Sequence, residues 1–516
     1  MTTEGLPVGQ PVTRRTGELL AFPMWVLGAL ALAAAGLGVS ALLDARFVYL
    51  GAALVFMVMG GVIVFYRPYV GILVIMSTML VSYPDALRGV GPFTVNNLLG
   101  AALITILAFE LYRTHDFWFL REPEVRLLLI ISGWLILISL LSDLYLPEKR
   151  LLPAVERRIE GRFMGTDDDS GRWIFELLSR IAFIIFFLNW VKEPRQLRWV
   201  LYLFAICIAM VVPTLGTDVA REEEFRVTSK VVGWASNLNR FAFMMNVGIA
   251  LFLYLANVLR SLPLKALCLI CALGSVQLVL MSASRSGFIG LGIVGLLLVL
   301  GPQVPKRWKI ASALGGLAIG LIAFNFLIED YHRERLLNLN PFADTSVVRL
   351  EGSNSTEIRV STLANAMTII AQYPLTGVGL ANYRWLNALL SDSYKPPHNS
   401  YVWALAEGGI PAMVLYLTLF GFLYTRIQKL RPQYANHPTL PHLPEWLRIY
   451  LFLFLFFSIF ADVWLEVHLY FLVAFTIVMS RWAEEAELRG RGLPGFVAGT
   501  PGARRAAARA LYRRAT

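Results

Sequence analysis

The sequence predicts an all-α polytopic membrane protein with about 12–14 transmembrane helices, and three observations support this fold class. Hydrophobic residues make up 57% of the 516 residues and charged residues only 16%, too few for the polar surface of a soluble protein of this size. Apolar runs of roughly 20 residues, the length that crosses the hydrocarbon core, recur along the chain. Basic residues gather in every second connection between these runs, as the positive-inside rule requires.

The individual membrane spans are predicted from apolar runs that end at charged residues, prolines or glycines. The first run is too long for the hydrophobic part of a signal peptide and lacks a small-residue cleavage site before Arg46, so we interpret it as a retained span. The runs that meet at 283–286 and at 463–465 can each form one hairpin. In chain order, the predicted spans are residues 19–43, 47–65, 68–84, 93–112, 125–142, 173–191, 197–215, 232–259, 263–283, 286–301, 308–328, 400–425, 446–463 and 465–482.

The alternating basic connections predict that both ends of the chain lie in the cytoplasm. The net charge of +11 then follows from membrane topology and does not indicate a nucleic-acid-binding surface. The Arg-rich tail is expected to contact anionic membrane lipids. The predicted organisation is a cytoplasmic N-terminus at 1–18, transmembrane helices with short loops at 19–328, a large external loop at 329–399, C-terminal transmembrane helices at 400–482 and a basic cytoplasmic tail at 483–516.

Several kinds of site find no support in the sequence. The cysteines Cys207, Cys268 and Cys271 lie inside apolar runs, so they indicate neither a disulfide framework nor a zinc site. No carboxylate pair has the spacing of a metal site. The isolated Gly377-Val378-Gly379 follows no predicted strand, so it is not a nucleotide-binding fingerprint. We therefore expect no metal ion and no cofactor.

The large external loop is predicted to be partly helical. Apolar positions follow helical spacing from Asn354 to Tyr373, and Pro374 ends this helix. Asn354 and Glu357 resemble a capping box at its start. A glycine-rich turn and a second short helix over 383–390 follow. We expect this amphipathic part of the loop to lie on the membrane surface.

His398 is the first candidate for catalysis. It precedes the predicted span 400–425, whose N-terminus Asn399 or Ser400 can cap. His398 would then lie at the positive end of a long helix, which favours anions and a neutral imidazole that can accept a proton. The alternative is a polar residue at a water interface, and position alone does not separate the two.

Two further candidates are arginines on the external side. Arg285 lies between small residues in the stretch 282–287, and an arginine near the membrane interface needs a partner, a water-filled cavity or a bound anion. The alternative is a side chain that extends to the lipid headgroups. Arg359 is expected in the first turn of the loop helix, where an anion such as phosphate would offset the unfavourable helix dipole. Its alternative is a solvated surface arginine.

Arg180 and Arg240 are predicted inside spans 173–191 and 232–259, about two turns from the external end. Charge within the membrane is by default a functional hypothesis. The alternative is a structural ion pair, for which the candidate partners are Glu176, Asp462 and Glu466.

These residue types point to one reaction. Guanidinium groups bind pyrophosphate through paired hydrogen bonds. A positioned histidine suits proton abstraction from a sugar hydroxyl. A site at the membrane surface suits a lipid-linked substrate.

Short motifs in the second half of the chain carry a resemblance to a known family. They are Ser284-Arg285-Ser286-Gly287, Glu357-Ile358-Arg359, Pro374-Leu375-Thr376-Gly377-Val378-Gly379, His398-Asn399-Ser400-Tyr401 and Glu407-Gly408-Gly409. Their order and spacing, over about residues 170–480, resemble the O-antigen ligase and polymerase superfamily of bacterial membrane glycosyltransferases. Its members include lipopolysaccharide O-antigen ligases, O-antigen polymerases of the Wzy type and pilin-type O-oligosaccharyltransferases.

The resemblance implies a GT-C-like fold in the bacterial cytoplasmic (inner) membrane, with the large loop in the periplasm. It implies an inverting, metal-independent transfer of glycan from an undecaprenyl-pyrophosphate-linked donor to a hydroxyl of a glycan, a lipid A core or a protein. By motif, Arg285 and Arg359 would hold the pyrophosphate and His398 would activate the acceptor hydroxyl. The candidate substrate-binding residues are Arg240, Asn239, Arg180, Asn399 and Tyr401.

Two other functional classes fit parts of the sequence. A lipid-linked oligosaccharide flippase can have a similar number of spans, but it should show two related halves and polar residues along a central path. Here the polar features lie on one face. A non-catalytic assembly protein would leave Arg285 and His398 unexplained. The sequence does not separate ligase, polymerase and protein oligosaccharyltransferase.

Overall fold

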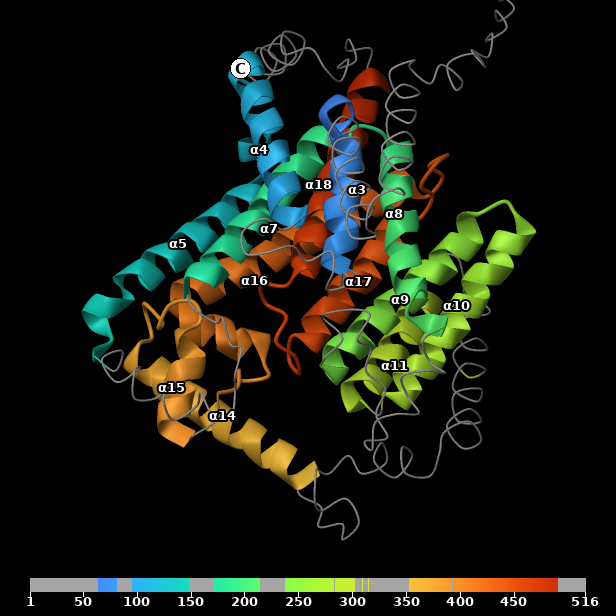
Figure 1. Cartoon of the computed structure of the whole chain (residues 1–516). Helices are drawn as coiled ribbons and strands as arrows, with labels where there is room; N and C mark the ends of the chain where they lie inside the picture. Colours follow the sequence, from blue (N-terminus) through green and yellow to red (C-terminus); the bar gives the residue numbers. More distant parts are fainter. Residues whose placement is uncertain are drawn as a thin grey trace, which may run out of the picture. The chain divides into compact units, whose positions relative to one another are not determined.

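The structure, a computed structural model, describes residues 64–80, 95–147, 170–213, 237–282, 284–301, 309, 314, 352–391 and 394–490. The chain divides into two units, residues 1–68 and 69–516, and nearly all of the described residues belong to the second. Within these ranges the secondary structure is helical, without strands. In chain order (Figure 1), the helices are α3 (Pro68–Leu80), α4 (Val95–Thr114), η2 (Trp118–Arg121), α5 (Pro123–Tyr145), α7 (Ser170–Trp190), α8 (Pro194–Ala209), α9 (Leu238–Val258), α10 (Leu262–Met281), α11 (Arg285–Val299), α14 (Gly352–Gln372), α15 (Asn382–Ser391), α16 (Ser400–Tyr434), α17 (Leu443–Phe457) and α18 (Val467–Gly490).

Six of these helices are long and apolar enough to cross a membrane, which confirms an all-α polytopic membrane protein. They are α4 over Asn97–Thr114, α5, α7, α9, α10 and α16, and α3 and α11 are shorter apolar helices. The predicted span 19–43 and most of spans 47–65 and 308–328 lie outside the described residues. The total of 12–14 spans and the GT-C-like arrangement therefore stay predictions.

Several predicted boundaries differ from those in the structure, among them the following. Helix α9 begins at Leu238 and not at 232, and α16 continues to Tyr434, well beyond the predicted end at 425. The runs predicted to meet at 463–465 are separated by a connection over 458–466. The reason is that apolar composition marks the residues that suit hydrocarbon, whereas capping and local hydrogen bonds decide where a helix begins and ends.

Aromatic side chains fill the space between α7, α9, α17 and α18. The ring of Phe243 on α9 lies 6.1 Å from that of Tyr450 and 5.4 Å from that of Phe457, both on α17. Phe183 of α7 contacts Phe471 of α18 at 5.3 Å. All five rings are buried, and burial of each stabilises the fold by about 1.5–3 kcal/mol. These helices provide a closely packed support for the connection between α17 and α18.

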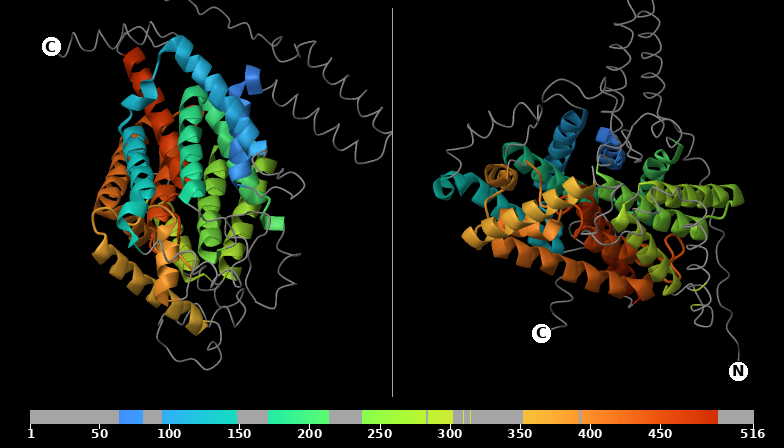
Figure 2. Two further views of the ribbon diagram at one scale, coloured as in Figure 1. Left: turned by 60° about the vertical axis from the view of Figure 1, so that its left-hand side comes forward. Right: turned by 90° about the horizontal axis from the view of Figure 1, so that it is seen from below.

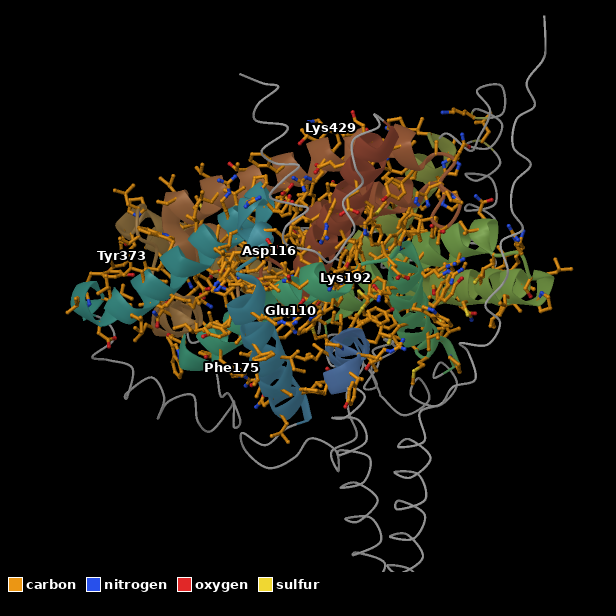
Figure 3. The ribbon with its side chains drawn as sticks, turned by 90° about the horizontal axis from the view of Figure 1, so that it is seen from above. Glu110, Asp116, Phe175, Lys192, Tyr373 and Lys429 are labelled. Carbon is orange, nitrogen blue, oxygen red and sulfur yellow. The ribbon has the colours of Figure 1, made fainter. Side chains whose placement is uncertain are left out.

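Charged side chains pair where the predicted cytoplasmic connections begin. Lys192 lies 3.7 Å from Glu110 of α4, and the indole of Trp190 donates a hydrogen bond of 2.8 Å to the same carboxylate. Figure 3 shows Glu110 and Lys192 on adjacent segments. Arg426 of α16 contacts the buried carboxylate of Glu124 on α5 at 2.9 Å. These ion pairs join helices that are distant in the sequence.

Helix α16 is broken at Gly409, as the glycines and the proline of the stretch 407–411 predict. Gly409 has φ 67° and ψ −175°, a conformation open essentially to glycine alone. Pro411 has no N–H, so the carbonyl of Glu407 has no helical donor four residues later. Backbone groups freed in this way need other partners inside a membrane protein.

The segment 374–380, which links α14 to α15, supplies these partners. The three hydrogen bonds run from Val378 N to Ala406 O (2.9 Å), from Gly379 N to Glu407 O (2.8 Å) and from Ile410 N to Pro374 O (2.8 Å). Gly377 also has a positive φ of 63°, and a Cβ there would collide with the backbone of Glu407. Two motifs singled out in the sequence therefore interlock through their backbones. We call this contact the α16 clamp.

Replacement of Gly409 should weaken the α16 clamp. We expect Gly409→Ala to destabilise the protein by on the order of 1–3 kcal/mol or more, because alanine disfavours this conformation. Its Cβ would also collide with the carbonyl oxygen of Leu375. Gly421→Ala in the same helix is the matched control, since a Cβ there meets nothing within 4 Å. Thermal unfolding of the purified protein in detergent measures both, and equal melting temperatures would contradict the role of the clamp.

Candidate active site

The N-terminus of α16 is built as the sequence predicts. Asn399 caps the helix, because its side-chain oxygen accepts hydrogen bonds from the backbone N–H of Tyr401 at 3.0 Å and of Val402 at 3.1 Å. His398, just before this cap, has a positive φ of 53°. Such a conformation is uncommon outside glycine and often marks a functional position.

The connection 458–466, between α17 and α18, packs against the N-terminus of α16. Ser400 N donates to Ser458 O at 2.7 Å, and Ser400 Oγ donates to Ala461 O at 2.6 Å. The same hydroxyl accepts a hydrogen bond of 2.8 Å from Val463 N. Ser400 is fully buried. Its hydroxyl therefore binds the backbone on both sides of one residue, Asp462.

Asp462 faces the imidazole of His398. The distance from His398 Nδ1 to Asp462 Oδ2 is 2.9 Å. An ionised carboxylate only accepts hydrogen bonds, so the pairing places a proton on Nδ1, and in the uncharged tautomer the lone pair is then on Nε2. The aspartate side chain is 3% exposed and the histidine side chain 22% exposed, so part of the ring remains accessible.

The sequence did not reveal this histidine–aspartate pair. The sequence offers Asp462 only as a structural partner for an arginine, and 64 residues separate it from His398. The signal that was present is an acidic residue at the predicted meeting point of two spans. A charged residue between two apolar runs indicates a structural or functional role, but only the structure shows that the partner of Asp462 is His398.

Arg240 extends from α9 to the same connection. Its Nη1 lies 2.7 Å from the carboxylate of Glu466, and its Nη2 donates to the backbone carbonyl of Asp462. Asn237 caps α9, so Arg240 lies in the first helical turn, and the predicted position two turns inside the span is wrong. The prediction failed because residues 232–237 are apolar enough to extend a hydropathy run.

Arg180 reaches the connection from α7. Its Nη2 lies 2.9 Å from Glu176, one turn earlier in the helix, and its Nη1 donates to the backbone carbonyl of Leu465. The structural alternative is thus present for both arginines: Arg180 pairs with Glu176 and Arg240 pairs with Glu466. Burial alone would raise the pKa of Glu466, but the guanidinium groups of Arg240 and Arg180 bring this pKa below its ordinary value. Glu466 therefore stays ionised.

Asn239 links Arg285 to this arrangement. Its side-chain oxygen accepts hydrogen bonds from Ser284 at 2.9 Å and Ser286 at 3.0 Å, and its amide donates to the carbonyl of Phe460 at 2.7 Å. Ser284 caps α11. Arg285 is accordingly the first residue of a helix whose start is bonded to Asn239 of α9, and Asn239 in turn is bonded to the connection 458–466.

The remaining predicted residues lie as follows. Arg359 is exposed on α14 and lies about two turns from the helix start, so its expected place in the first turn is wrong. The helix begins at Gly352, ahead of the first apolar position that the spacing could detect. The hydroxyl of Tyr401 donates to the carbonyl of Leu455 at 2.9 Å and joins α16 to α17. A meeting of Arg359 with His398 stays a prediction.

Potential metal ligands do not cluster in the part of the chain that is described. No group of three or more His, Cys, Asp or Glu side chains there could hold an ion. The predicted metal independence stays a prediction.

The comparisons with known proteins concern the region around His398. Residues 266–417 match the family model for O-antigen ligase, a segment that contains Arg285, Arg359 and His398. No curated protein matches the chain. This match confirms the resemblance seen in the sequence motifs and supports the O-antigen ligase and polymerase superfamily for residues 266–417.

Proposed function

We propose that this protein transfers a glycan from an undecaprenyl-pyrophosphate-linked donor to an acceptor hydroxyl at the external membrane surface. The O-antigen ligase domain supports glycan transfer in general and does not favour the flippase alternative. The observation that carries the mechanism is the 2.9 Å hydrogen bond between His398 Nδ1 and Asp462 Oδ2. With Nδ1–H donating to this carboxylate, Nε2 is the nitrogen that can accept a proton when the ring is uncharged.

The reaction begins with the acceptor hydroxyl near His398 Nε2. The hydroxyl oxygen bonds to the anomeric carbon of the donor, the bond from that carbon to the pyrophosphate oxygen breaks, and the hydroxyl proton passes to Nε2. Attack opposite to the leaving group inverts the anomeric centre. Asp462 orients the ring and stabilises the imidazolium that forms.

The departing pyrophosphate gains negative charge as its bond to carbon breaks. Fixed guanidinium groups stabilise this charge most strongly in the transition state. Arg285 is our first choice for this role, because Asn239 and the cap of α11 fix its backbone. Arg359 is the second, and it would approach from α14. The ion pairs of Arg180 and Arg240 favour a positioning role for those two residues.

The acceptor distinguishes three versions of this function. A lipid A core makes the protein a ligase, a second lipid-linked repeat makes it a polymerase, and a protein hydroxyl makes it an oligosaccharyltransferase. Purified protein with one lipid-pyrophosphate glycan and each acceptor in turn tests all three. Release of lipid pyrophosphate together with glycosylation of one acceptor supports the proposal. Movement of intact donor across the bilayer without cleavage would instead mark a flippase.

Removal of the base should abolish most of the transfer. We expect His398→Ala to lower kcat by about 10²–10⁴-fold, the usual contribution of a general base. The melting temperature is measured alongside, because the substitution also removes a partner of the buried Asp462. His442→Ala is the matched control, because His442 also has a positive φ and precedes a helix, α17. Normal transfer by His398→Ala would refute the assignment of the base.

Ser400 should act through Asp462. We expect Ser400→Ala to lower kcat by about 10-fold or more, because a shift of roughly 1 Å at a positioned group can cost up to 10²-fold. The same substitution should have little further effect in an Asp462→Asn background, since coupled residues are not additive. Ser275→Ala is the control, because Ser275 is equally buried and its hydroxyl donates to the carbonyl of Cys271 within its own helix, α10. Equal losses in both backgrounds would indicate a general structural role for Ser400.

The shape of the Arg285 side chain should matter as well as its charge. We expect Arg285→Ala to lower kcat by about 10²-fold or more and Arg285→Lys to recover only part of this loss, because lysine cannot bind pyrophosphate bidentately. The exposed Arg260, in the connection between α9 and α10, provides the control variant Arg260→Ala. Steady-state kinetics with varied donor separates kcat from KM. Full activity of Arg285→Ala would remove this residue from the mechanism.

A further inference from the structure

Helix α14 exposes large apolar residues on its outward side: Val360 is 54% exposed, Leu363 41% and Met367 55%. Its inward side buries Thr362 and Ala366 completely and Ile369 almost completely. A surface helix that lies in water would carry polar residues on its outward side.

The exposed apolar residues form one continuous stripe. At 100° per residue, Val360, Leu363, Ala364, Met367 and Ala371 fall within roughly a 100° arc of the helix surface. All five are exposed. The exposed polar residues Thr368 and Gln372 lie to one side of this arc. This pattern is that of a helix at a membrane interface.

Polar contacts on the inward side prevent α14 from turning its apolar stripe inward. Asn365 Nδ2 donates to Asn387 Oδ1 at 2.8 Å and to Ser391 Oγ at 2.9 Å, both on α15. The hydroxyl of Tyr383 on α15 donates to the backbone carbonyl of Thr362 at 2.7 Å. The orientation of the helix is therefore fixed by buried hydrogen bonds.

The stripe continues onto a membrane-spanning helix. Leu375, just after α14, is 65% exposed, and its neighbour Pro374 accepts the hydrogen bond from Ile410 of α16. On α16, Ile410, Val414 and Leu417 are 47%, 55% and 48% exposed. Helix α16 is one of the six that can cross a membrane, and in Figure 2 α14 lies alongside it. Exposed apolar residues of both helices thus lie on either side of the contact between Pro374 and Ile410.

We propose that α14 lies in the external membrane interface, with the stripe 360–371 immersed in the acyl chains of the leaflet that α16 enters. The partner is lipid hydrocarbon, because the stripe extends a surface that already faces the bilayer. The inference does not depend on the proposed reaction. It places the helix that carries Arg359 in the leaflet, so a lipid-linked molecule reaches this helix by lateral diffusion and not from the water.

Spin labels on cysteine variants test this placement in vesicles of phosphatidylethanolamine and phosphatidylglycerol. Met367→Cys reports the stripe, Thr368→Cys is the adjacent polar control, and Leu417→Cys is the lipid-facing reference. The partly exposed native Cys268 is replaced by serine in every variant. Collision with oxygen, which concentrates in lipid, is compared with collision with a water-soluble nickel chelate.

The label at 367 should resemble that at 417, with the ratio of oxygen to nickel collisions shifted well above the ratio at 368. Melting temperatures of the labelled variants confirm that the fold is intact. A ratio at 367 equal to that at 368 would mean that the stripe faces water, which overturns the proposal. Protection of 367 from both reagents would mean that a protein covers the stripe, which overturns it as well.

Discussion

The candidate site depends on one buried hydroxyl, that of Ser400. It donates to the carbonyl of Ala461 and accepts from the N–H of Val463, so its donor and an acceptor lone pair are both in use. A buried polar group that loses such a partner costs about 1–3 kcal/mol, which favours a single arrangement of the connection 458–466. Asp462 lies between the two bonded residues and is directed toward His398. The same connection then binds Arg240, Arg180 and Asn239 through its backbone carbonyls.

The first part of α16 is fixed at both of its ends. The connection 458–466 holds its N-terminus, and the α16 clamp holds the break at Gly409. A proline and glycines usually weaken a membrane helix. Here the backbone groups of α16 that are left without a helical partner form hydrogen bonds with the segment 374–380, which links α14 to α15. Movement of α14 and α15 is thereby joined directly to the helix segment that follows His398.

The sequence predicted the local features of this structure well. Hydropathy placed the helices, the residue types predicted Asn399 or Ser400 as a cap, and proline with glycine predicted the break in α16. Each of these depends on residues a few positions apart. The pairing of His398 with Asp462 depends on helix packing across 64 residues, which no local pattern contains. The positions of Arg240 and Arg359 within their helices were wrong because apolar spacing does not detect polar helix starts. The roles of all these residues in catalysis remain predictions.

The hydrogen bond between Pro374 O and Ile410 N joins the two ends of the chain segment 374–410. This segment contains α15 and His398, and the hydrogen bond closes it into a ring. Residues ahead of α14 lie outside this ring. Insertions or deletions there leave the ring's length and internal register unchanged, whereas a single residue gained or lost between 374 and 410 shifts the imidazole relative to Asp462. The structure thus constrains the length of the chain between 374 and 410. We expect differences in loop length among relatives to fall ahead of α14.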